Sequence, residues 1–122
     1  DCGKIINPMI VDGQVHGAVA QGMGVALLEE VLYDESGQLL TASLADYLVP
    51  SATEVPHMET LHIEAESPGT VGGFRGMGEG GTIGAPAAIA NAIADALAPL
   101  GIEVYELPMT PERIFCAIRA AR

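Results

Sequence analysis

Apolar and polar residues follow two different periods along the chain. In 59–67, apolar residues alternate with histidine and glutamate, which predicts a half-buried strand with an acidic outer face. Farther on, Ile89, Ile93 and Leu97 recur at helical spacing and predict the core stripe of a helix from about Ala85 to Leu97. Both kinds of element are therefore expected in one chain.

Helix-start signals predict two further helices. Asn7 precedes Pro8, and Thr110 precedes Pro111, so each pair places a capping side chain before a proline at the first helical position. We expect a helix from Pro8 to about Leu32 and a last helix that begins at Pro111.

The first predicted helix carries an unusual face. Gly13, Gly17 and Gly24 fall within a narrow arc at about 100° per residue, with Gln14 and Gln21 beside them. A glycine inside a helix costs up to about 1 kcal/mol relative to alanine, so something is expected to pack closely on this face, either another helix or a bound cofactor. For Gln14 we favour helix packing with a side-chain hydrogen bond. For Gln21 the pattern fits such packing and contact with a cofactor equally well.

Shorter signals complete the predicted fold. Residues 30–43 suggest a hairpin that turns at 35–37, residues 43–57 an irregular crossing segment, and residues 101–108 one more strand. A glycine-rich loop is expected over 68–82. The fold class is therefore α+β, with three helices packed with short mixed strands in a single domain or a piece of one.

Composition narrows the function classes. The chain of 122 residues has 16 acidic and 5 basic side chains, for a net charge of -11, which disfavours nucleic acid and anionic lipid surfaces. Only 17% of residues are charged, so much of the surface is expected to face other protein. The two cysteines have no metal-binding or disulfide pattern and suggest reduced thiols in the cytoplasm, and no run approaches the roughly 20 apolar residues of a membrane span.

Glu79 is the single acid within a glycine-rich stretch, "GGFRGMGEGGTIGAP". The letters satisfy G-x-G-x-x-G, but no buried strand precedes them and a carboxylate would repel pyrophosphate, so dinucleotide binding is disfavoured. Two interpretations remain. Glu79 is either a solvated carboxylate near a helix start or a general base placed by a rigid loop whose amides approach a ligand.

Other polar residues carry weaker signals. The three histidines show no paired metal-ligand spacing, so no protein metal ligands are predicted. Arg75, beside the loop, is interpreted as a surface ion-pair partner.

Three motifs in order resemble one enzyme family. "DCGKIINPMIVDGQVHGAVAQGMGVALLEEVLYDESGQLL", "DYLVPSATEVP" and "GMGEGGTIGAPAAIANAIADAL" together span nearly the whole chain. They resemble the C-terminal part of the molybdopterin-binding large subunit of the xanthine dehydrogenase, aldehyde oxidase and aerobic carbon monoxide dehydrogenase family.

The resemblance implies a role for each matching position. Glu79 would be the base that takes a proton from the oxygen ligand at molybdenum, Gln21 would lie near the pterin, and the amides of Gly78, Gly80, Gly81 and Thr82 would lie along the cofactor. The cofactor would be molybdenum–molybdopterin, with the cytosine dinucleotide as one of its forms, and its dithiolene would hold the metal. Iron-sulfur clusters and FAD would be carried by other domains or subunits, and the substrate would be an aldehyde, an N-heterocycle or a related small molecule oxidised with oxygen from water.

The same resemblance implies that residues 1–122 are catalytically incomplete alone. They would be a C-terminal segment of the cofactor-binding domain, as a fragment or as a split subunit that completes the site in trans. A non-catalytic structural or assembly module of the same fold is the alternative.

Overall fold

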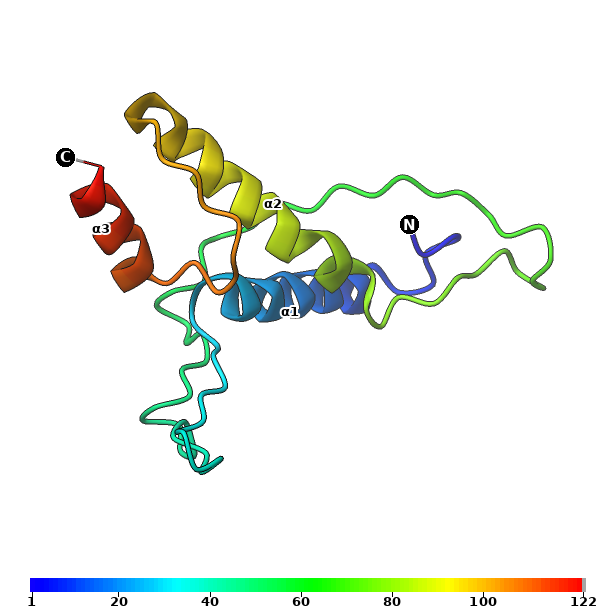
Figure 1. The fold of residues 1–122 in the computed structure, drawn as a ribbon. Coiled ribbons are helices and arrows are strands. Elements are labelled where there is room, and N and C mark those ends of the chain that lie inside the picture. Colours follow the sequence, from blue (N-terminus) through cyan, green and yellow to red (C-terminus); the bar gives the residue numbers. More distant parts are fainter. Residues whose placement is uncertain (122) are drawn as a thin grey trace.

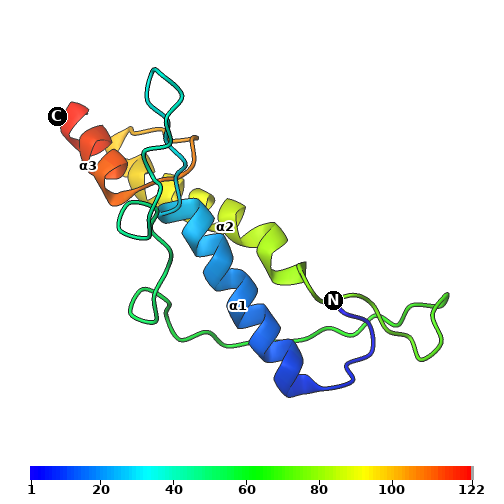
Figure 2. The same cartoon turned by 90° about the horizontal axis from the view of Figure 1, so that it is seen from below.

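Two helices that are distant in sequence lie side by side at the centre of the computed structural model, which describes residues 1–121 (Figures 1 and 2). Helix α1 spans Pro8–Leu27 and helix α2 spans Gly80–Leu97, followed by the short 3₁₀ helix η1 at Ala98–Leu100. Helix α3 spans Pro111–Ala120 near the C-terminus. The first turns of α2 run along the middle of α1, and α2 then diverges from it (Figure 1).

Small residues allow α1 and α2 to approach closely. A Cβ added to Gly22 would lie 2.5 Å from the Cβ of Ala85, and one added to Gly81 would lie 2.9 Å from the Cβ of Ala18. By contrast, nothing in the described chain lies within 4 Å of a Cβ added to Gly13. Among the glycines of the predicted arc, Gly24 is closely packed, against Glu29 and Pro50, whereas Gly13 and Gly17 remain open. The close contact with α2 is made at Gly22, outside that arc.

The caps predicted for α1 and α3 are confirmed. The Asn7 side chain accepts a hydrogen bond from the Ile10 amide at 3.3 Å, and the Thr110 side chain accepts one from the Arg113 amide at 3.3 Å. However, α1 ends at Leu27, five residues before the predicted end. The amides of Leu28 and Glu29 both donate to the Gly24 carbonyl, and the chain then leaves the helix toward the turn at 34–38.

Helix α2 begins five residues earlier than predicted, so Pro86 lies inside the helix and not in its first turn. Glycines and proline favour a loop by propensity, but the contacts that 81–86 make with α1 outweigh that preference. As a consequence, Glu79 occupies the N-cap position of α2 and is not in the middle of a loop.

The mixed strands are not confirmed. Within residues 1–121, β pairing is limited to two isolated bridges, Gly3 with Phe74 and Tyr33 with Leu39. The second bridge and the left-handed Gly37 support the predicted turn at 35–37. Residues 59–67 and 101–108 have no partner strand in the described chain, and a strand requires one to satisfy its backbone groups.

The chain buries few of its apolar side chains. Leu97 and Met109 are buried, and the Met109 amide donates to the Ala26 carbonyl at 2.6 Å, which ties the segment before α3 to the end of α1. In contrast, Leu61 is 97% exposed and Ile63 is 86% exposed. Much of the surface is thus apolar, in line with the expectation that it faces other protein.

One apolar stretch corrects the sequence interpretation. Residues Gly80–Leu100 form a helix that is long and apolar enough to cross a membrane, by length and composition alone. The prediction that no stretch approaches the length and hydrophobicity of a membrane span was therefore wrong for these residues. Core helices of soluble proteins meet the same criteria, and the first turns of α2 pack against α1.

Candidate functional site

Glu79 stands at the start of α2 with its side chain exposed. Its backbone (φ -116°, ψ 5°) leads into the helix, and its carboxylate makes no capping hydrogen bond. Gly80 and Gly81 form the first turn of α2. The first amides of a helix have no acceptor within the helix, and among the described residues the Gly80 and Gly81 amides have none outside it. Two backbone donors that are available to a ligand therefore directly follow the acid in the chain.

Helix α1 holds the backbone on both sides of Glu79. The Gln14 side-chain Nε2 donates to the Gly78 carbonyl at 2.6 Å, and the Thr82 hydroxyl donates to the Ala18 carbonyl at 3.2 Å. Between these contacts, Gly81 lies so close to α1 that an added Cβ would be 3.3 Å from the Val15 carbonyl oxygen. Residues 78–82 are thus fixed on one face of α1.

The fold brings some of the predicted site residues together and leaves one, Gln21, without a hydrogen bond to the others in the described chain. Glu79, Gly78, Gly80, Gly81 and Thr82 are consecutive, so they lie together at the start of α2.

Gln21 lies on α1, exposed, two turns beyond Gln14, and within residues 1–121 its side chain makes no hydrogen bond to the site. Gln14 makes the side-chain hydrogen bond expected of it, but its acceptor is the residue before the candidate base, which sequence reasoning missed. The only signal was that Gln14 lies seven residues from Gln21 on the same face.

Thr82 already uses its donors within the chain. Its amide donates to the Glu79 carbonyl at 3.1 Å and its hydroxyl to α1. Its hydroxyl oxygen can still accept a hydrogen bond from a ligand.

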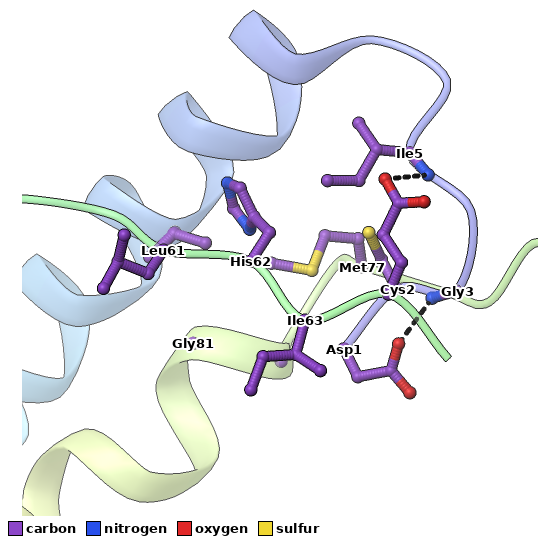
Figure 3. A pocket seen from close by; sticks show the side chains of 12 residues that line it. Asp1, Cys2, Gly3, Ile5, Leu61, His62, Ile63, Met77 and Gly81 are labelled. Carbon is purple, nitrogen blue, oxygen red and sulfur yellow. Dashed lines mark hydrogen bonds between the residues drawn. The ribbon is translucent and has the colours of Figure 1, made fainter. Parts of the chain in front are cut away.

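A small hollow of about 160 Å³ opens beside the start of α2 (Figure 3). It is lined by the N-terminal segment, by residues 61–64, and by Met77, Gly80 and Gly81. Binding pockets for drug-sized ligands measure roughly 300–1,000 Å³, so this hollow alone is too small for a large cofactor. It can hold a small molecule or one part of a larger ligand.

Asp12, on α1, binds the segment that forms one wall of this hollow. Its carboxylate accepts a hydrogen bond from the Thr60 hydroxyl at 2.7 Å and lies 2.7 Å from His62 Nε2. The hydrogen bond from Thr60, followed by the one from His62, lowers the pKa of the Asp12 carboxyl below its usual value. The segment that carries Leu61, His62 and Ile63 is thereby held beside the site (Figure 3).

Arg75, beside the loop, has structural partners. The surface ion pair predicted for Arg75 is confirmed, because its Nε lies 3.4 Å from Asp1 Oδ2 and also donates to the Ala65 carbonyl at 2.9 Å. Within residues 1–121, no group of three or more His, Cys, Asp or Glu side chains could hold a metal ion.

Comparison with known proteins connects this geometry to one kind of domain. Residues 1–56 match the model of the molybdopterin cofactor-binding domain. The nicotine 6-hydroxylase large subunit of Paenarthrobacter nicotinovorans is 50% identical over 119 residues, which are 98% of this chain and 15% of that protein. The carbon monoxide dehydrogenase large chain of Hydrogenophaga pseudoflava is 37% identical over 98% of this chain and 15% of its own length.

Solved structures agree with the sequence matches. The crystal structure of quinoline 2-oxidoreductase from Pseudomonas putida 86 superimposes with a TM-score of 0.94 at 52% identity, covering 98% of this chain and 15% of that one. A Cu,Mo-CO dehydrogenase superimposes with a TM-score of 0.94 at 37% identity, covering 99% of this chain and 15% of that one. The described chain thus spans about 15% of the length of these relatives.

Proposed function

Because the chain belongs to the xanthine dehydrogenase and carbon monoxide dehydrogenase family of molybdopterin-binding large subunits, we propose that it supplies the base Glu79 to the site of a molybdenum hydroxylase. One observation carries the proposal. Glu79 stands exposed at the start of α2, between two backbone positions that α1 holds in place. A base must be fixed in position and must reach the reacting proton, and this arrangement meets both needs.

The residues around Glu79 fit a molybdopterin cofactor. Apart from Gly78 itself and its two neighbours in the chain, no described residue lies within 4 Å of a Cβ added to Gly78, so the backbone there is open to a ligand. The amides of Gly80 and Gly81 have no acceptor in the described chain, and pterin edges and phosphates offer acceptors for such donors. We assign Gly78, Gly80 and Gly81 to this contact, together with Gln21 from α1, and Thr82 through its hydroxyl oxygen as an acceptor.

The chemistry divides between the cofactor and the chain. When bound, the molybdenum centre would supply a two-electron acceptor and a water-derived oxygen. The chain supplies a carboxylate that takes up one proton at an Oε atom of Glu79. It also supplies the glycine backbone, which leaves room for the cofactor and the substrate beside that carboxylate.

The substrate class follows from the relatives only in outline. Their names refer to nicotine, quinoline and carbon monoxide, and we propose an aldehyde, an N-heterocycle or a related small molecule for this protein. The cofactor would take the molybdopterin form, with the cytosine dinucleotide as one variant.

The partners follow from the incomplete site. The rest of the large subunit would surround these residues, as parent chain or as a separate subunit, and iron-sulfur and flavin domains or subunits would remove the electrons. The proposed compartment is the cytoplasm.

Replacement of Glu79 tests the base directly. In the assembled enzyme, we expect Glu79→Gln to lower kcat by roughly 10²- to 10⁴-fold while molybdenum and pterin content stay unchanged, because the amide keeps the shape and cannot take up a proton. Glu35→Gln, on the exposed turn far along the chain, is the matched control and should retain full turnover. Wild-type turnover by Glu79→Gln would refute the assignment.

The exposure of Glu79 also suits the alternative, a non-catalytic module in which this carboxylate only stabilises the start of α2. That alternative predicts a purified complex without molybdenum or pterin. Elemental analysis and pterin fluorescence on the complex distinguish the two.

A further inference from the structure

We propose that Gln14 is a positioning residue for Glu79, an inference that rests on the proposed function of Glu79 as the base. The two residues lie far apart in sequence and on different helices. The Gln14 amide nevertheless donates to the Gly78 carbonyl at 2.6 Å across 64 residues of sequence. This is the carbonyl of the peptide unit that ends at the Glu79 nitrogen.

The planarity of that peptide unit carries the inference. In a trans peptide the carbonyl and the following N–H point in opposite directions within one plane. Because the Gly78 carbonyl points to α1, the Glu79 amide points away from α1. The orientation of this plane sets φ at Glu79, and φ in turn sets where the Glu79 side chain leaves the backbone.

Glycine makes this hydrogen bond necessary. Gly78 has open space around its Cα and no side chain that would restrict its rotation. The Glu79 side chain has no capping hydrogen bond of its own to fix it. Without Gln14, the peptide between Gly78 and Glu79 would lose a restraint on the upstream side, whereas Thr82 still holds the downstream side.

The test uses two variants of the assembled enzyme. Gln14→Met keeps the length of the side chain and removes the donor, and Gln14→Glu keeps the shape and replaces the donor by an acceptor-only carboxylate. Gln38→Met is the matched control, since Gln38 is exposed in the turn of the hairpin. Each variant is analysed for molybdenum and pterin content, for kcat and KM separately, and for amide hydrogen exchange in peptides that cover 74–80.

A positioning role predicts a specific combination of results. Misplacement of a catalytic group by about 1 Å can cost 10²-fold in rate, so we expect kcat to fall roughly 10- to 100-fold in both Gln14 variants. KM should stay within about twofold, molybdenum content should stay unchanged, and exchange in 74–80 should become faster. Adding Gln14→Met to Glu79→Gln should cost little more, because the positioned group is already absent.

Three results would overturn the inference. They are wild-type kcat in the Gln14 variants, unchanged exchange in 74–80, or a loss of activity in proportion to lost molybdenum, which would assign Gln14 to cofactor retention. Failure of the proposed function is separate, because it would show as an active Glu79→Gln enzyme. A dead Glu79→Gln enzyme with normal Gln14 variants would reject the positioning role alone.

Discussion

Because Gly81 has no side chain, the first turn of α2 can lie close to α1. An added Cβ there would lie 2.9 Å from the Cβ of Ala18, inside the distance that real methyl groups keep. Gly81 is also one of the amides proposed to face the cofactor. The same residue therefore serves helix packing and ligand contact.

Gly81→Ala should push the first turn of α2 away from α1. We expect the variant to be destabilised by about 1–3 kcal/mol through overpacking, and to retain less molybdenum when purified as the assembled enzyme. Thermal unfolding and elemental analysis measure both effects. Gly84→Ala is the control, because nothing in the described chain lies within 4 Å of a Cβ added there, and an equal effect of the two substitutions would contradict the packing explanation.

Sequence reasoning could name the candidate site residues but not the contacts that hold them in place. Gly78, Glu79 and Gly80 are neighbours in the chain, so their proximity needs no fold. The contact from Gln14 depends on how α2 lies along α1, and nothing local in the sequence specifies that arrangement.

At the scale of elements, capping signals were better predictors than strand patterns. Asn7 and Thr110 act within their own helices, so local sequence is sufficient to predict the starts of α1 and α3. A strand depends on a neighbour. The alternating segment 59–67 has an appropriate pattern but no partner strand in the described chain, and it is instead attached to α1 through Asp12.

That attachment should respond to substitution and to pH in a defined direction. The pKa of the Asp12 carboxyl is lower in the folded protein than its ordinary value of 3.8. The stabilisation that the ionised carboxylate gives to this attachment is therefore fully present above pH 3.8, and it is lost as the pH falls through the pKa of the folded state. In the assembled enzyme, Asp12→Ala should speed amide hydrogen exchange in 60–64 relative to wild type to the same extent at pH 7 and at pH 5, because both lie above this range. Asp34→Ala, at the distant turn, should leave that segment unchanged, and unaltered exchange in Asp12→Ala would show that the carboxylate does not hold it.

At the scale of the whole molecule, the chain exposes more surface than a globular protein of its size. Its accessible surface is 8551 Å² for 12.6 kDa. Folded monomers of this mass expose roughly 6,200 Å² by the usual scaling. The excess and the exposed Leu61, Ile63 and Val71 support the proposal that further protein covers this surface.

We therefore expect the isolated 122-residue chain to lack a cooperative fold. Expressed alone, it should bind a hydrophobic dye, unfold without a sharp thermal transition and self-associate in sedimentation experiments, because its apolar surface has no cover. The same chain within its parent assembly is the control. A monodisperse monomer with a sharp transition would contradict this expectation.

The pairing of α1 with α2 also has a consequence for synthesis. Residues 28–79 separate the two helices, so α1 leaves the ribosome well before α2, the helix that packs against it. Contacts between distant segments form slowly, because a long loop must close before they are made. During translation, α1 would remain without its partner for the time needed to add these residues, and the proposed base would reach its place only when α2 arrives.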